Sequence, residues 1–122
     1  MKKAGQVVVI KFPQTDYQGS KLRPAMLIAP LPGKYGDWLV CMISTQINQA
    51  IDNFDEIVNE DSIDFIRSGL KKASVIRISR LSIVAEDMLF GTTGEISNER
   101  LHRIKQQLAK WIAGNALNSN VN

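Results

Sequence analysis

The sequence is poor in the side chains that most often build disulfides and metal sites. Its 122 residues include one cysteine, Cys41, and one histidine, His102. A lone cysteine cannot form a disulfide within the chain, and a zinc site built on several cysteines or histidines is excluded. Catalysis that needs a pair of histidines is excluded as well. We expect Cys41 to be a small core residue and His102 to lie on the surface of a helix.

Long apolar runs are also missing. No run approaches the ~20 residues of a membrane-spanning helix, and the opening residues MKKAGQ lead directly into a strand-like run without a secretory leader. Hydrophobic residues make up 44% of the chain and charged residues 22%, which is typical of a folded domain. We therefore expect one cytoplasmic domain over residues 1–114, with no membrane contact, and a flexible polar tail over residues 115–122.

Charge is unevenly distributed along the chain. Residues 1–50 hold six basic and two acidic side chains, residues 51–64 hold six acidic and none basic, and residues 65–85 hold five basic and none acidic. Two basic segments in a chain of net charge +3 favour a surface that faces a polyanion. The alternative is ordinary solvated charge on loops and strand edges. We expect the acidic segment, Asp52 to Asp64, to be a solvated loop, because its spacing fits no calcium loop.

Hydrophobic patterning predicts a mainly β fold. Apolar, β-branched runs separated by Gly, Pro or polar residues predict strands at 7–12, 24–29, 38–45 and 74–84, the third central and the last bent. The weaker run at 54–58 is compatible with a short strand, the one at 62–66 with a short strand or a helical turn, and the one at 89–96 with a short strand or a turn. Such a series of strands followed by one helix favours a small barrel or strongly coiled sheet with the C-terminal helix packed on it.

The helix is predicted over residues 97–113. Ser97 is a favourable N-cap, Glu99 lies in the first turn where the helix dipole favours an acid, and Gly114 follows the end. An apolar stripe recurs at helical spacing and is expected to pack on the core, with members Leu101, Ile104, Leu108, Trp111 and Ile112. We also expect Trp38 to be a packing residue.

Polar residues at the ends of apolar strands are the candidates for chemistry. Pro24 biases Arg23 towards an extended conformation, which aims a guanidinium suited to bidentate contact with a phosphate. Ser44 and Thr45 end the third strand, and a hydroxyl beside an oriented arginine can contact a phosphate oxygen. Arg77 lies in an apolar strand and must reach a partner or the surface. The alternatives are an arginine that caps a strand, ordinary strand-end hydroxyls, and an edge-strand charge.

An ordered set of motifs resembles the PemK/MazF family of toxin ribonucleases. The set covers roughly residues 4–113 and comprises GQVV at residues 5–8, FP at 12–13, RPA at 23–25, CMISTQ at 41–46, GLKKASVIR at 69–77 and GEIS at 94–97. The chain differs from the common family pattern in several places. Gln6 follows Gly5 where aspartate is common, and Ser44 stands where threonine is usual. Ser79 stands where some members carry aspartate, and the loop at 14–22 lacks the histidine that some members have there.

The resemblance implies an SH3-like barrel of the PemK/CcdB type with a C-terminal helix, and a homodimer that cleaves single-stranded RNA without a metal or other cofactor. It also implies neutralisation by a cognate antitoxin protein. The family's catalytic arginine maps onto Arg23, and its strand-end hydroxyl maps onto Ser44, with Thr45 adjacent. We expect RNA to be bound by basic and polar residues near these positions, namely Lys21, Gln46, Lys71, Lys72 and Arg77.

These residues fit one chemistry, in which RNA supplies its own nucleophile, the ribose 2′-OH. The protein then needs to align that oxygen with the leaving 5′-oxygen and to stabilise the doubly negative phosphorane. The expected products are a 2′,3′-cyclic phosphate and a 5′-hydroxyl. Two other hypotheses stay open at this point: a toxin of the same fold that poisons gyrase by protein contact, and a barrel that binds nucleic acid without cutting it.

Overall fold

The computed structural model describes residues 1–13 and 20–114, and for residues 12–13 and 20–21 it describes the backbone alone. The expected tail at 115–122 lies outside these residues. The elements in chain order are β1 (Gln6–Pro13), β2 (Ser20–Pro30), β3 (Trp38–Ser44), the 3-10 turn η1 (Ile47–Gln49), β4 (Glu56–Val58), α1 (Phe65–Ser68), β5 (Ser74–Val84), the 3-10 turn η2 (Glu86–Met88), β6 (Leu89–Glu95) and α2 (Asn98–Ile112).

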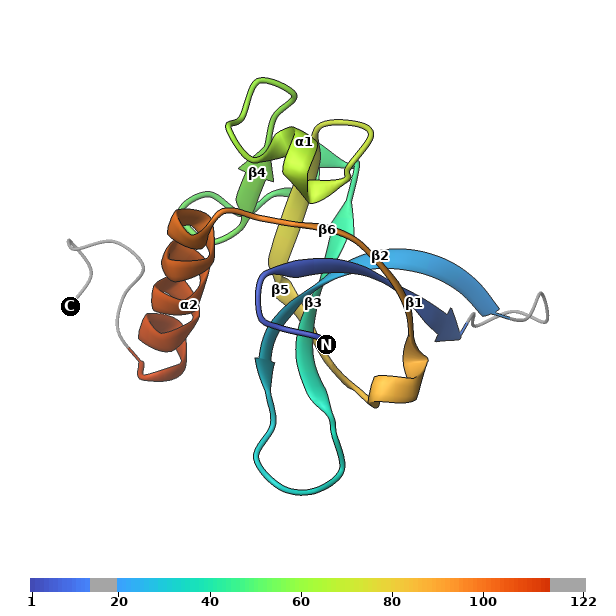
Figure 1. Cartoon of the computed structure of the whole chain (residues 1–122). Coiled ribbons are helices and arrows are strands. Elements are labelled where there is room, and N and C mark those ends of the chain that lie inside the picture. Colours follow the sequence, from blue (N-terminus) through green and yellow to red (C-terminus); the bar gives the residue numbers. More distant parts are fainter. Residues whose placement is uncertain (14–19, 115–122) are drawn as a thin grey trace.

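The six strands form one antiparallel sheet in the order β4-β5-β3-β2-β1-β6, and the sheet curls strongly around itself (Figure 1). The predictions of a mainly β fold, a central third strand and a C-terminal helix are confirmed. Over the described residues the two edge strands, β4 and β6, do not pair with each other. The sheet is therefore strongly coiled but not a closed barrel.

Strand β5 carries the predicted bend. Cys41 of β3 pairs with Leu81, yet its neighbour Met42 pairs with Arg77. The intervening residues 78–80 have no partner in β3, so the strand bulges there and its twist increases. The bend lets one long strand follow the curvature of the sheet.

Several predicted boundaries differ from the observed ones. Strand β2 begins at Ser20, although the polar residues before Pro24 read as loop, because these residues pair with β1 in an antiparallel ribbon. The weak run at 62–66 ends in the helical turn α1, and the run at 89–96 is strand β6.

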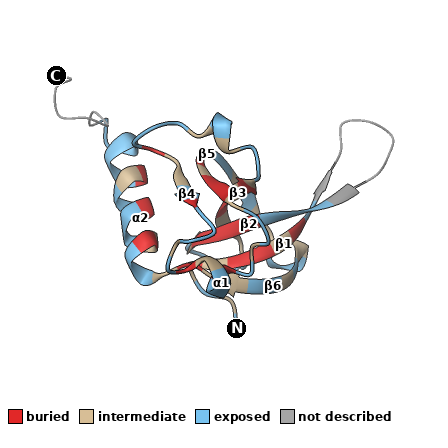
Figure 2. Ribbon diagram, turned by 90° about the horizontal axis from the view of Figure 1, so that it is seen from above, coloured by how far each residue is buried: buried red, intermediate tan, exposed pale blue. Residues whose placement is uncertain are grey.

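Apolar side chains pack on both faces of the sheet. One cluster lies between the sheet and α2 and includes Val7, Cys41 and Ile43 together with Ile104 and Leu108 of the helix. Figure 2 shows this buried side of α2 turned towards the strands. The second cluster covers the opposite face, with members Val8, Ile10, Ala25, Leu27, Trp38 and Val40. The curled sheet thus builds a core on each of its faces.

The predictions for isolated residues are confirmed with one exception. Cys41 is fully buried, which raises the pKa of its thiol, and His102 is exposed. Trp38 is buried, but Trp111 is 53% exposed and Ile112 66% exposed, so the predicted apolar stripe is wrong for the last turn of α2. The ring of Trp111 lies beside that of Phe54, with centroids 6.0 Å apart, while more than half of the Trp111 side chain faces solvent. No helix of the described residues has the length and apolarity to cross a membrane.

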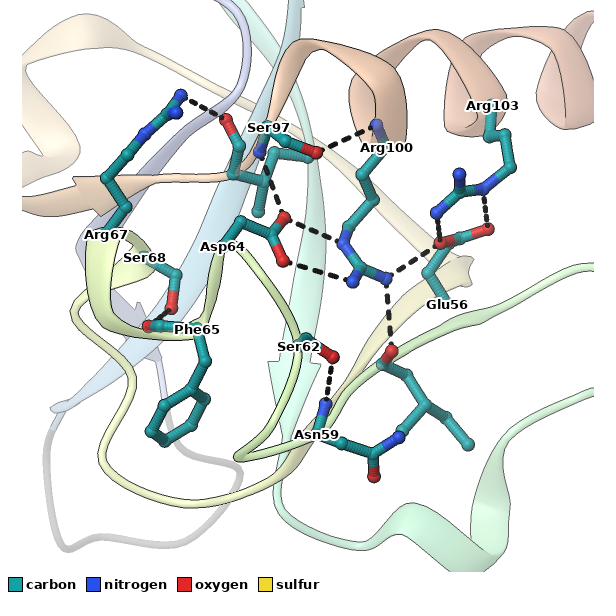
Figure 3. Close-up of polar contacts among 12 residues, drawn as sticks. Glu56, Asn59, Ser62, Asp64, Phe65, Arg67, Ser68, Ser97, Arg100 and Arg103 are labelled. Atoms are coloured by element: carbon teal, nitrogen blue, oxygen red, sulfur yellow. Dashed lines mark hydrogen bonds and ion pairs between the residues drawn. The ribbon is translucent and has the colours of Figure 1, made fainter.

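The prediction of a solvated acidic segment is wrong for its key members. Asp64 is 2% exposed, and both of its carboxylate oxygens accept hydrogen bonds from Arg100 Nε and Nη2, at 2.9 and 3.1 Å (Figure 3). Arg100 Nη1 donates to Glu56 Oε1 at 2.9 Å, and Glu56 also pairs with Arg103. Asp55 accepts hydrogen bonds from the backbone and hydroxyl of Ser79. These acids hold the loop on α2 and β5.

The ion pair with Arg100 changes the pKa of Asp64. Burial by itself would raise the pKa of Asp64, but the hydrogen bonds from Arg100 and from the Ser97 N–H favour the ionised form and lower the pKa to about 2. Asp64 directly precedes α1, and its hydrogen bonds to Ser97 and Arg100 link α1 to the N-terminus of α2. Ser97 caps that helix, because its side-chain oxygen accepts the backbone N–H of Arg100.

Candidate functional site

The strand register brings three of the predicted site residues onto one face of the sheet. Ala25 of β2 lies opposite Met42 of β3, and Met42 lies opposite Arg77 of β5. Arg23 and Ser44 each lie two residues beyond the Ala25–Met42 pair along their own strands. Because directly opposed residues project to the same face and side chains alternate with a period of two, Arg23, Ser44 and Arg77 share that face.

Arg23 lies on the ribbon that β1 and β2 form beyond the last pair of β2 with β3, Ala25 with Met42. Its backbone pairs with Ile10 of β1, and its side chain is exposed. Among the residues that the structure describes, its guanidinium takes part in no hydrogen bond or ion pair. The arginine is thus held by its strand, while its donors face solvent and can bind an anion.

Arg77 is anchored from the neighbouring turn. Its Nη1 donates to the side-chain oxygen of Gln49 in η1 at 3.0 Å, and the residue is half-buried. Its Nε is buried and has no partner within the described ranges 1–13 and 20–114. The prediction that this arginine must reach a partner or the surface is confirmed, and the alternative of an edge-strand charge is wrong because β5 lies between β4 and β3.

The strand-end hydroxyl of Ser44 has one defined hydrogen bond. Its Oγ accepts the backbone N–H of Gln46 at 3.0 Å, which fixes the turn that follows β3. The hydroxyl hydrogen of Ser44 does not take part in that bond, so it can be donated to a ligand oxygen. Thr45 and Gln46 are exposed beside it.

A cavity of about 370 Å³ opens beside this strand end. Four residues predicted for the site line it, Ser44, Thr45, Lys71 and Lys72, although they come from two distant segments of the chain. The remaining lining is apolar or hydroxyl-bearing and contains no carboxylate: Val7, Val9, Pro24, Ile43, Gly69, Leu70, Ser74 and Thr93. Arg23, Gln46 and Arg77 do not line it, and the side chain of Lys21 lies outside the described part of the chain.

The wall that carries the two lysines is closely packed. Gly69 ends α1 with a φ of +75°, and a Cβ atom there would collide with the backbone carbonyl of Thr93. A Cβ atom at Gly94 would collide with the backbone of Arg67 and Ser68 in the same way. Only glycine allows α1 to lie directly on β6 at these two points. Both glycines belong to the sequence motifs, but their packing role has no local signal because the contact joins segments far apart in sequence.

In the described parts of the chain, the carboxylate, thiol and imidazole groups form no cluster of three or more that is suited to hold a metal ion. The absence of a metal or cofactor from the reaction stays a prediction.

Comparisons with known proteins agree with the geometry. Residues 3–112 match the family described as PemK-like, MazF-like toxin of type II toxin-antitoxin system. No curated protein has a significantly similar sequence.

Two solved structures share the fold. One is an endoribonuclease in complex with its cognate antitoxin from Mycobacterial species, with a TM-score of 0.66 and 13% identity, covering 93% of this chain and 96% of that chain. The other is the Mycobacterium tuberculosis toxin MazF-mt6, with a TM-score of 0.61 and 13% identity, covering 87% of this chain and 96% of that chain. Since the family match spans nearly the whole sequence, this chain belongs to the PemK-like, MazF-like toxin family of type II toxin-antitoxin systems.

Proposed function

We propose that this toxin is an endoribonuclease that cleaves single-stranded RNA without a metal ion. The observation that carries the proposal is the shared sheet face of Arg23, Ser44 and Arg77. The cavity lined by Lys71 and Lys72 meets this face at Ser44 and otherwise opens on the opposite face of the sheet, where Val9, Pro24 and Ile43 line it. Two lysines and two nearby arginines suit a phosphodiester backbone, and the cavity lining has no carboxylate to repel it.

The roles follow from the chemistry of phosphate transfer. The ribose 2′-oxygen attacks the adjacent phosphorus, the bond from phosphorus to the 5′-oxygen breaks, and a proton passes from the nucleophile to the leaving oxygen in the course of the reaction. Arg23 supplies positive charge to the doubly negative phosphorane, and Ser44 donates its hydroxyl hydrogen to a non-bridging oxygen. Thr45 offers a second hydroxyl at the same strand end. Arg77, held by Gln49, contributes a fixed charge on the same face.

Lysine and amide side chains around this face are assigned to substrate binding. Lys71 and Lys72 are exposed on the cavity rim, where their ammonium groups can meet phosphates on either side of the cleaved bond. We assign Gln46, and Lys21 of β2, to the same role. Binding of these charges to RNA releases counterions from the phosphate backbone. The free energy gained from that release becomes smaller as the salt concentration rises, so the affinity for RNA should fall.

Two protein partners complete the proposal. A structure of similar fold was solved as an endoribonuclease in complex with its cognate antitoxin, which supports neutralisation of this toxin by an antitoxin of its own. We also propose a homodimer, in which the basic segments of two subunits frame one RNA strand.

The test is incubation of the purified chain with a long single-stranded RNA in excess EDTA, followed by mapping of the new 5′ ends. We expect cleavage at a small number of sites, with 5′-hydroxyl and 2′,3′-cyclic phosphate ends. Intact RNA would overturn the proposal, and a gyrase poison or a passive RNA-binding domain would give that result.

A further inference from the structure

We propose that Gln49 is a positioning residue of the ribonuclease, which orients the guanidinium of Arg77 towards the RNA phosphate without neutralising its charge. This inference rests on the proposed function and adds a residue that lies outside the sequence motifs. Gln49 ends the 3-10 turn η1, and its Oε1 accepts a hydrogen bond from Arg77 Nη1 at 3.0 Å. Within the described part of the chain, no other group accepts a hydrogen bond from this guanidinium.

This single bond decides the orientation of Arg77. Its Nε is buried and has no partner among the residues that the structure covers, so no hydrogen bond at that nitrogen fixes the plane of the group. An arginine side chain has many rotamers, and restricting them costs conformational entropy. The contact of Nη1 with Gln49 therefore selects one direction for the guanidinium. The donors on Nη2 have no partner within residues 1–13 and 20–114, and they remain available to an anion.

A hydrogen-bonded turn connects this contact with the hydroxyl of Ser44. Ser44 Oγ accepts the backbone N–H of Gln46 at 3.0 Å, and the carbonyl of Gln46 accepts the backbone N–H of Gln49 at 3.0 Å. The turn therefore fixes the position of Gln49 relative to the end of β3. Through Gln49 it holds the Ser44 hydroxyl and the Arg77 guanidinium in one arrangement. Groups that act on the same phosphate need such a fixed arrangement for efficient catalysis.

A second contact ties the same loop to β5. Asp55 accepts hydrogen bonds from the backbone N–H and the hydroxyl of Ser79, both at 3.1 Å, and from the backbone N–H of Ile51 at 2.9 Å. Ser79 lies two residues after Arg77, in the bulged part of the strand. The loop that carries Gln49 is thus attached to β5 at two neighbouring points, and this restricts its movement.

The chemistry of an amide explains why glutamine suits this position. An amide oxygen accepts a hydrogen bond but has no formal charge, so Arg77 keeps its full positive charge for a phosphate. Arg100 shows the alternative, because its guanidinium is paired with the carboxylates of Asp64 and Glu56. A carboxylate at position 49 would offset the charge of Arg77 and repel RNA. Since Gln49 is exposed, its hydrogen bond adds little to stability, and we infer that its value lies in orientation.

The experiment uses two variants that remove these properties separately. Single-turnover cleavage of a long RNA at saturating protein gives the rate of chemistry, and fluorescence anisotropy with an uncleavable 2′-deoxy strand gives the affinity. Gln49→Met keeps nearly the same length but has only a weakly accepting sulfur. We expect its cleavage rate to fall about tenfold at unchanged affinity, since a misplacement of ~1 Å can cost up to about a hundredfold.

Gln49→Glu should have a different effect, because it keeps an acceptor oxygen and adds a negative charge. We expect weaker binding of the deoxy strand. The slope of log affinity against log salt should become shallower by about 0.7, the contribution of one phosphate contact on a single strand. Affinity and salt slope equal to those of the parent would overturn the proposal, because residue 49 would then lie away from the bound phosphates.

A double-mutant cycle distinguishes orientation of Arg77 from a general effect on the fold. Gln49→Met should slow cleavage in the parent but have no further effect in an Arg77→Met background, because the two residues act as one unit. The matched control is Gln106→Met, which removes an exposed glutamine of α2 and should behave as the parent in every assay. Equal slowing by Gln49→Met in both backgrounds would overturn the proposal, and so would a parental rate in the single variant.

The contact can also be tested without cleavage, so a failure of this inference is distinguishable from a failure of the proposed ribonuclease activity. The NMR signal of the Arg77 Nε–H is identified by its loss in Arg77→Met. In the parent this buried proton should exchange slowly with water. In Gln49→Met it should exchange faster, because the guanidinium is no longer held. Equal exchange in the two proteins would overturn the inference, whereas a parent that leaves RNA intact would overturn the proposed function.

Discussion

Two arginines of this chain show opposite solutions to the same electrostatic problem. The Arg100 side chain is 10% exposed, and its guanidinium meets two carboxylates and the backbone carbonyl of Ile57. Arg23 is exposed, and its guanidinium has no such partner among the described residues. A charge removed from water needs partners to offset its desolvation, whereas a charge left in water remains free to bind an anion. The first arginine therefore serves the fold, and the second is available for function.

The largest expected effect comes from breaking the buried pair. Asp64→Ala leaves the Arg100 guanidinium buried with an incomplete set of partners, and we expect the free energy of unfolding to fall by about 3–5 kcal/mol. Urea denaturation measures it. The control is Glu95→Ala, which removes exposed ion pairs to Lys3 and Arg67 and should cost less than about 1 kcal/mol. Equal losses for the two variants would contradict the comparison.

At the exposed Arg23 we expect a large loss of activity and little change in stability. Arg23→Ala should lower the rate of RNA cleavage at least a hundredfold, since a preorganised donor to the transition state is worth ~3 kcal/mol. Its free energy of unfolding should change by less than about 0.5 kcal/mol, as for other surface substitutions. Arg80→Ala, at another exposed arginine, should keep both quantities near those of the parent. Full activity of the Arg23 variant would refute its assignment.

Low pH should lower the free energy of unfolding through the buried Asp64–Arg100 pair. The pKa of Asp64 is lowered from 3.8 to about 2, so the ionised group stabilises the fold above pH ~4, and this stability is lost as pH falls towards about 2. The loss should be about 2 kcal/mol, measured by urea unfolding at several pH values. In Asp64→Asn that part of the pH dependence should disappear. If the variant keeps the parent's full acid sensitivity, the lowered pKa belongs to another group.

A smaller effect is expected at the strand-end hydroxyl. Ser44→Ala should reduce cleavage by at least about tenfold, because one hydrogen bond from a hydroxyl to the charged phosphate is lost. Ser44→Thr keeps the hydroxyl and should retain most of the activity. Initial rates on a fixed RNA at saturating concentration provide the measurement. Equal loss in the alanine and threonine variants would show that the shape of the residue matters rather than its hydroxyl.

Local patterning predicts most of the fold. Apolar runs locate the strands, and Ser97 marks the start of α2, because strand burial and helix capping depend on neighbouring residues. The acidic segment was mispredicted since Asp64 meets Arg100, a partner 36 positions away that no local pattern identifies. The exposure of Trp111 likewise depends on which residues of the sheet pack against the last turn of the helix, and helical spacing alone does not identify them.

Part of the candidate site could also be predicted from the sequence, and part could not. The residue types and the RP and STQ motifs identify Arg23 and Ser44, and the register then sets them on one face. The cavity was not predicted, because Lys71 and Lys72 line it together with Ser44 through the packing of α1 on β6, which Gly69 and Gly94 permit. Tertiary contacts of this kind depend on complementary surfaces rather than on sequence spacing.

The central claim is that the exposed face around Arg23 cuts RNA with the ribose's own hydroxyl as nucleophile. The most direct test places a single 2′-deoxy sugar immediately before a mapped cleavage site in an otherwise unmodified RNA, and compares its single-turnover cleavage in EDTA with that of the all-ribose strand. We predict that the deoxy substrate is bound with similar affinity and is not cut at that bond. Cleavage of both strands at comparable rates would contradict the account.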